Sequence, residues 1–162
     1  MKTPALFLVL VIALPGLAHA APAEDHWSSD MDPKLAEDFL EAGELIVAEE
    51  FAAALPILRR LAVDLPANAD VFNMLGFAYR KTGDLERSAP NYERALHLNP
   101  NHLGALEYQG ELFLMLGDLP AAEANLARLK RLCASPCEER DELTEAIRTW
   151  TSAQSGVERK AD

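Results

Sequence analysis

Cys133 and Cys137, the two cysteines of the chain, are its residues best suited to covalent chemistry. They lie four positions apart, and Ser135 and Pro136 between them interrupt a continuous helix. An even number of cysteines in an exported protein favours a disulfide, which over so short a loop would stabilise the fold by about 2 kcal/mol. Because Cys137 stands near the start of a predicted helix, a lowered thiol pKa and a redox role are an alternative. A third interpretation is that the two cysteines are free thiols or metal ligands.

The histidines and the other catalytic residue types form no recognised motif. His97 and His102 flank Pro100, but they lack a third ligand at helical spacing, so we expect solvated loop residues and no metal site. The sequence contains no Gly-rich phosphate loop and no G-x-S-x-G motif. We therefore predict that the protein is not an enzyme and has no catalytic residues and no cofactor.

The first twenty residues predict export. Lys2 precedes an apolar run over 5–14, Pro15 and Gly16 follow, and the segment ends in Ala18-His19-Ala20. This order is typical of a secretory signal peptide cleaved after Ala20, and the run is shorter than the about 20 apolar residues that span a membrane. We expect a periplasmic protein in a bacterium, or a secreted one by another route.

The charge of the chain narrows its range of partners. The formal net charge is −11, and it becomes −12 when the signal peptide, with one lysine and no acid, is removed. Such acidity argues against nucleic acid and anionic membrane surfaces as partners, and we expect no membrane insertion.

Residues 21–33 are polar and contain prolines, so we predict a flexible leader there.

Apolar residues recur at helical spacing from Lys34 to about Ala153, and strict apolar–polar alternation is absent, so we predict an all-α fold. Ser135, Pro136 and Glu138 predict the start of a last helix over 136–153, followed by a disordered tail over 155–162. We expect the apolar side of this helix, which includes Ile147 and Trp150, to cover the end of the fold. The other predicted helices are 33–48, 52–64, 71–81, 85–98, 103–116 and 119–132.

One 34-residue motif organises these helices. It consists of Phe72, Leu75-Gly76, Tyr79, Gly83, Leu85, Ser88, Tyr92, Ala95-Leu96 and Pro100. This motif resembles the tetratricopeptide repeat, a helix–turn–helix unit. A shift of 34 residues finds Gly110, Gly117 and Ala122 on one side and Ala54 and Pro66 on the other, whereas Glu49 replaces the turn glycine. The resemblance implies three repeats, over about 35–68, 69–102 and 103–136, in a superhelical domain over 34–154. Ala54, Ser88 and Ala122 should lie at close helix crossings.

The resemblance also implies a concave groove that binds a protein or peptide, with the partner at positions 2, 5, 9, 12 and 13 of each repeat. The Lys/Asn/Arg clamp of chaperone-binding members is matched only at Asn73, so chaperone tails are not expected as ligands. The alternative for Arg80 and Lys81 is an ion pair with Glu44, Glu49 or Glu111. The residues that we predict to bind a partner are Phe39, Ile46, Val47, Asn73, Phe77, Arg80, Lys81, Leu114 and Met115.

Together these features predict a non-catalytic protein–protein interaction module or assembly scaffold in the periplasm, which binds a peptide or helix in its groove. An apolar groove would also permit self-association. The alternative is a redox or metal-handling accessory protein that uses Cys133 and Cys137.

Overall fold

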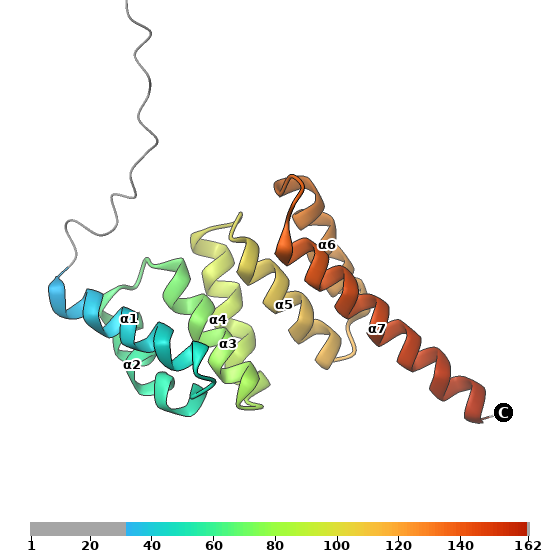
Figure 1. Cartoon of the computed structure of the whole chain (residues 1–162), viewed down its shortest axis with the longest axis horizontal. Coiled ribbons are helices and arrows are strands. Elements are labelled where there is room, and N and C mark those ends of the chain that lie inside the picture. Colours follow the sequence, from blue (N-terminus) through green and yellow to red (C-terminus); the bar gives the residue numbers. More distant parts are fainter. Residues whose placement is uncertain (1–31, 162) are drawn as a thin grey trace, which may run out of the picture. The chain divides into compact units, whose positions relative to one another are not determined.

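The structure, a computed structural model, describes residues 32–161, which form seven α-helices and no strand (Figure 1). The all-α prediction is confirmed. The predicted signal peptide and residues 21–31 of the predicted leader lie outside the described residues. Within 32–161, no helix combines the length and the apolar character needed to cross a membrane. The helices are α1 (Pro33–Val47), α2 (Phe51–Asp64), α3 (Ala69–Lys81), α4 (Leu85–Leu98), α5 (Leu103–Met115), α6 (Leu119–Leu132) and α7 (Glu138–Ala161).

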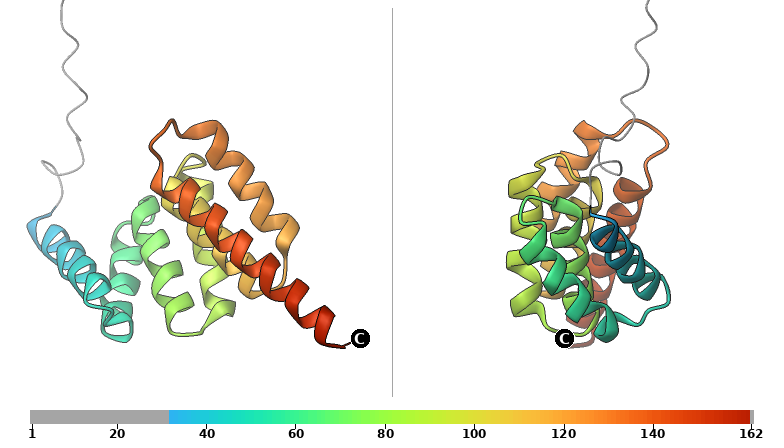
Figure 2. Two further views of the ribbon diagram at one scale, coloured as in Figure 1. Left: turned by 45° about the vertical axis from the view of Figure 1, so that its right-hand side comes forward. Right: turned by 90° about the vertical axis from the view of Figure 1, so that its left-hand side faces the viewer.

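The first six helices form three helical hairpins that stack in chain order (Figures 1 and 2). Within the hairpins α1 packs on α2, α3 on α4 and α5 on α6; between them α2 contacts α3 and α4 contacts α5. The first helices of the hairpins also touch, α1 with α3 and α3 with α5. This stacking is the expected superhelix, and it aligns α1, α3 and α5 along one face.

The turn inside each hairpin uses one residue in the left-handed region. Its φ angle is 59° at Glu49, 83° at Gly83 and 80° at Gly117. After each of these residues, the next backbone N–H donates to the carbonyl five residues before it, as in Asp84 N to Tyr79 O at 2.9 Å. Glu49 therefore makes the same turn as the two glycines, although a side chain disfavours this conformation.

Side-chain hydrogen bonds connect neighbouring hairpins at equivalent positions. The guanidinium of Arg94 donates to the carbonyl of Pro66 at 3.0 Å. Arg128, 34 residues later in the sequence, donates to the carbonyl of Pro100 at 2.6 Å. Each arginine lies on the second helix of a hairpin, and each proline lies in the loop that leads into that hairpin. The 34-residue repeat in the sequence thus also repeats the hydrogen bond that connects one hairpin to the next.

His102 has a structural role that the sequence prediction missed. It is half-buried, and its Nδ1 accepts a hydrogen bond from Ala105 N at 3.2 Å, so that the ring caps α5. The other nitrogen, Nε2, therefore carries the proton and donates to Asp70 Oδ1 at 3.0 Å. The prediction of a solvated loop was wrong for His102, because the ring replaces a capping carboxylate. His97 is exposed, as expected.

Small residues allow the close helix crossings that were predicted. Ala54, Ser88 and Ala122 are fully buried, and Ser88 Oγ donates to Gly76 O at 2.7 Å. A Cβ atom at Gly76 would lie 2.7 Å from the ring of Tyr92, which shows how closely α3 approaches α4.

The last helix, α7, covers the end of the stack. Leu143 is fully buried in a cluster with Leu106, Leu126 and Leu129, and Ile147 packs against that cluster. Figure 2 shows α7 running along α5 and α6. The predicted cap is therefore present, with Leu143 at its centre.

Three details of α7 differ from the prediction. It begins at Glu138, not at Pro136, because the carbonyl of Cys137 accepts its first helical hydrogen bond, from Asp141 N at 3.2 Å. Ser135 is therefore not its N-cap. The helix continues to Ala161, where a disordered tail was expected. Trp150 is only half-buried, because it lies beyond the end of the leucine cluster.

Candidate partner-binding site

Three aromatic rings meet at the centre of the face formed by α1, α3 and α5. Phe77 of α3 lies 4.7 Å from Tyr108 of α5 and 5.7 Å from Phe51, the first residue of α2, measured between ring centroids. The contact with Phe51 is edge-to-face, at an interplanar angle of 73°. We call Phe51, Phe77 and Tyr108 the aromatic cluster. It joins all three hairpins, and each ring is half-buried, so each keeps a surface for a ligand.

Two cations lie over these rings but differ in their bonding. The guanidinium of Arg80 is 5.4 Å from the centroid of Phe77 and 5.6 Å from that of Tyr108. It also pairs with Glu111 at 2.5 Å, and its side chain is only 10% exposed. The ammonium of Lys81 is exposed and lies 5.5 Å from the centroid of Phe51. The internal ion pair considered for Arg80 is present, so Lys81 is the more accessible cation.

Three buried polar atoms of α3 and α4 have no hydrogen-bond partner within the described part of the protein. They are the Nε of Arg80, the Oδ1 of Asn73 and the hydroxyl of Tyr92. Burial raises the pKa of Tyr92, and the neighbouring Arg80 partly opposes this shift. Asn73 is half-buried, and its exposure is therefore less than the groove prediction implied.

The other predicted residues divide between the surface and the core. Phe39 and Val47 line an apolar pocket of about 490 Å³ along α1, and Met115 is exposed at the end of α5. Ile46 packs partly against the first hydrophobic core. Leu114 is only 7% exposed, so it belongs to the core and does not face a partner. The position of Leu114 within its repeat therefore does not predict that its side chain is exposed in the groove.

Three residues of this face were missed by the sequence prediction. Tyr108 completes the aromatic cluster, Phe51 closes its other side, and Leu40 is 67% exposed beside Phe39 in the α1 pocket. Tyr108 and Leu40 both occupy position 6 of their repeats, 68 residues apart in the sequence. Adding position 6 to the partner-facing set would have found both residues.

A second surface, between α5 and α7, is strongly acidic. It is an open pocket of about 680 Å³ lined by Glu111, Glu138, Asp141, Glu142, Glu145 and Ala146; we call it the acidic pocket. Beside it, Glu107 is only 3% exposed and lies close to the carboxyl group of Glu142. Burial, reinforced by Glu142 and the other nearby carboxylates, raises the pKa of Glu107 to about 9.

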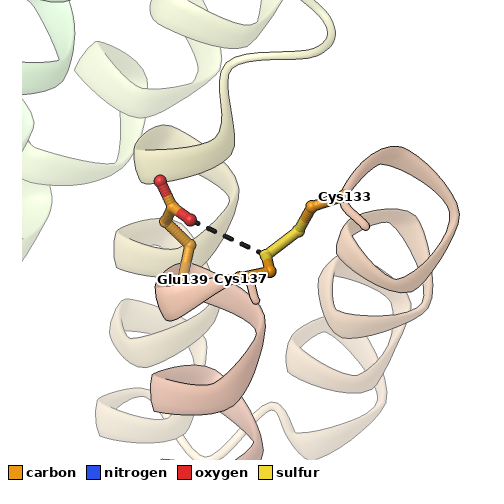
Figure 3. A group of neighbouring side chains, drawn as sticks. All are labelled: Cys133, Cys137 and Glu139. Carbon is orange, nitrogen blue, oxygen red and sulfur yellow. Dashed lines mark hydrogen bonds between the residues drawn. A yellow bond between two sulfur atoms is a disulfide. The ribbon is translucent and has the colours of Figure 1, made fainter. Parts of the chain in front are cut away.

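The two cysteines form a third group of interest (Figure 3). Cys133 follows α6 as its C-cap, and Cys137 precedes α7; their sulfur atoms lie within bonding distance, and their Cα atoms are 6.0 Å apart. A carboxylate oxygen of Glu139 lies 3.7 Å from the sulfur of Cys137. The ligand atoms of these three residues lie within 4.8 Å of one another, the only such set of His, Cys, Asp and Glu in the described residues.

Comparison with known proteins finds a family profile that matches part of the chain. Residues 73–135 match the sequence profile of the tetratricopeptide repeat. Over 56 residues the chain is 38% identical to the uncharacterized protein ycf37 of Pyropia yezoensis, a match that covers 35% of this chain and only 32% of that protein.

Solved structures with this fold come from diverse organisms. The type III secretion chaperone SycD of Yersinia enterocolitica, solved with a peptide of the translocator YopD, has a TM-score of 0.65 at 18% identity over 82% of this chain and 98% of that one. The domain of Sgt2 from Aspergillus fumigatus scores 0.64 at 17% identity, over 81% and 85% of the two chains. MamA from Desulfovibrio magneticus RS-1 scores 0.59 at 21% identity, over 62% and 56%. The profile match shows a tetratricopeptide repeat sequence in residues 73–135. The three helical hairpins and these likenesses show that the described part of the chain has the fold of tetratricopeptide repeat proteins.

Proposed function

We propose that this protein is a non-catalytic binding module or assembly scaffold, which holds a peptide or helix of a partner protein on the face of α1, α3 and α5. The observation that carries the proposal is the aromatic cluster, with Lys81 exposed beside it. Aromatic side chains dominate the binding energy of many interfaces because they bury a large area at a small entropic cost.

The surface on α1 extends this site with apolar area. Leu40 is 67% exposed and Val47 is 86% exposed, and Leu40 holds on α1 the repeat position that Tyr108 holds on α5. Exposed apolar side chains on the same face as an aromatic cluster favour an amphipathic segment, which would place its apolar side against them. The likeness to SycD, whose crystal structure contains a translocator peptide, supports peptide binding by analogy of fold.

Crosslinking in cells, followed by capture of the protein and mass spectrometry, would identify the partner. Its affinity for wild type, Phe77→Ala and Val63→Ala would then be measured by calorimetry. Val63 is an exposed apolar residue of α2 outside the face, so it controls for loss of any apolar side chain. We expect Phe77→Ala to weaken binding at least ten-fold, a hot-spot effect of about 1.4 kcal/mol or more. Equal affinities for Phe77→Ala and Val63→Ala would refute this site.

We also propose that the protein acts after export, with Ala21 as its first mature residue. The support is the basic start, the short apolar run and the Ala18-His19-Ala20 end of the N-terminal segment. N-terminal sequencing of protein from fractionated cells tests this. A protein that retains Lys2 and stays in the cytosolic fraction would refute it.

In that compartment Cys133 and Cys137 would form a disulfide that fixes the end of α6 to the start of α7. The second candidate function, redox or metal handling, is favoured by one observation, the carboxylate of Glu139 beside Cys137. Two thiols and a carboxylate are suitable ligands for zinc after reduction. A thiol count on protein that is purified natively and then denatured separates the structural disulfide from the second candidate function. No thiols before reductant and two after it support the structural disulfide. Two free thiols, with bound zinc, support the second candidate.

A further inference from the structure

The acidic pocket adjoins the aromatic cluster through shared residues. Arg80 contacts the ring of Tyr108 and pairs with Glu111, and Glu111 lines the acidic pocket. Burial, together with the charges of Glu107 and Glu142, raises the pKa of Tyr108. A segment bound over the aromatic rings would therefore continue directly into the carboxylates of α5 and α7.

The cations of the protein satisfy only part of this acidic surface. Besides the pair of Arg80 with Glu111, Arg140 pairs with Asp141 at 2.8 Å and Arg148 with Glu145 at 2.5 Å. Among the described residues, Glu138 and Glu142 have no ion pair. At the side of the pocket Glu107 is buried close to a second carboxyl group, that of Glu142. The site thus offers negative charge, a buried carboxyl group and the nearby face of Tyr108, which together suit a cation.

Resting on the groove function proposed above, we infer that the acidic pocket takes a lysine or arginine side chain of the bound segment, so that the partner is a cationic amphipathic peptide or helix. Apolar side chains of this segment lie on the aromatic cluster, and its positive charge meets Glu138 and Glu142. Charge complementarity also argues against a second copy as the occupant, because the chain has a net charge of −11. A metal ion fits less well, since the carboxylates of the pocket do not converge on one point. Among the described residues, only Cys133, Cys137 and Glu139 bring three ligand atoms that close together.

Two synthetic probes test the inference: an amphipathic leucine–lysine peptide and a leucine–glutamate peptide of the same pattern. Binding to the mature chain would be measured by fluorescence anisotropy, with the double variant Glu138→Gln/Glu142→Gln. The matched control is Glu93→Gln/Glu123→Gln, which removes the same charge from exposed positions on α4 and α6. We expect the lysine peptide to bind at least ten-fold more tightly than the glutamate peptide. The pocket variant should weaken lysine-peptide binding about five- to ten-fold and the control less than two-fold.

A second readout follows Glu107 directly. A docked cation favours the ionised carboxylate, so the pKa of Glu107, measured by ¹³C NMR of the labelled carboxyl group, should fall when the lysine peptide saturates the chain. Unchanged titration on saturation, or a pocket variant that binds like the control, overturns the inference. Equal binding of both peptides, weakened by Phe77→Ala, overturns it but leaves the groove function intact. If neither peptide binds, the inference fails. The groove function is then tested separately, by comparing the affinity of the captured partner for wild type and for Phe77→Ala.

Discussion

The middle hairpin, α3 and α4, and the terminal hairpin, α5 and α6, use equivalent residues for different contacts. Gly76 lies against the ring of Tyr92 within its own hairpin, whereas Gly110, one repeat later, lies 2.6 Å from Leu143 of α7, measured from an ideal Cβ position. Likewise Asn73 is half-buried in the open face, whereas Glu107, also one repeat later, is buried beside α7. Neighbouring repeats thus keep their backbone geometry while the added helix changes what each position does. A terminal repeat is adapted to its cap as much as to its fold.

The largest effect should come from removing the contact that distinguishes the terminal hairpin. Leu143→Ala should lower the free energy of unfolding by about 2–5 kcal/mol, because it leaves a cavity in a fully buried cluster. Trp150→Ala, on the same helix but half-buried, should cost clearly less. Urea denaturation of both variants measures the difference. Equal losses would mean that Leu143 is not the centre of the cap.

The buried carboxyl group of the terminal hairpin should make stability depend on pH. The pKa of Glu107 is about 9 in the folded chain against 4.5 ordinarily, so between these values the folded state holds more protons than the unfolded state. Stability contributed by this group is present below about pH 4.5 and is lost as pH rises towards 9, by about 1–3 kcal/mol up to neutral pH. Chemical denaturation between pH 5 and 8 should show this slope in wild type, and Glu107→Gln should reduce it. The exposed control Glu123→Gln should keep it; a variant slope equal to that of wild type would contradict the assignment.

Replacing each of the two equivalent glycines by alanine should destabilise the middle and terminal hairpins to different extents. Gly76→Ala would place a Cβ 2.7 Å from the rigid, buried ring of Tyr92, and we expect a loss of about 1–3 kcal/mol. Gly110→Ala meets the flexible end of Leu143, so its loss should be smaller and should fall mainly on the packing of α7. Melting temperatures, with hydrogen exchange to locate the change, measure both effects. A larger loss for Gly110→Ala would reverse the comparison.

The smallest effect should be a gain, at the turn of the first hairpin. Glu49→Gly should stabilise the chain by about 0.5–1 kcal/mol, since glycine adopts a φ of 59° without the steric penalty of a side chain. Gly83→Glu makes the reverse change at the equivalent turn, and it should destabilise by a similar amount. Thermal unfolding of both variants tests whether the first turn is strained.

The repeat helices were predictable because their signals are local. Turn glycines and small residues at fixed intervals determine where a helix ends and where two helices cross. The start of α7 was misplaced because a pattern that resembled a cap at Ser135 lies outside the helix, which begins after Cys137.

The site was predictable only in part, because its geometry depends on contacts between hairpins. Phe77, Arg80 and Lys81 lie together on the face of α1, α3 and α5, and the sequence offered two equal interpretations of Arg80, of which the ion pair with Glu111 is present. Phe51 and Tyr108 reach Phe77 from other hairpins, and the burial of Leu114 depends on packing across the stack. None of these contacts follows from the spacing within one repeat.

The bonds from Arg94 to Pro66 and from Arg128 to Pro100 give the stack a mechanical character. Each of these two junctions has its own arginine-to-carbonyl hydrogen bond at the equivalent place, so the contacts at one junction do not depend on those at the other. Relaxing one bond would loosen a single joint and change the curvature of the face there, while the neighbouring hairpins stay folded.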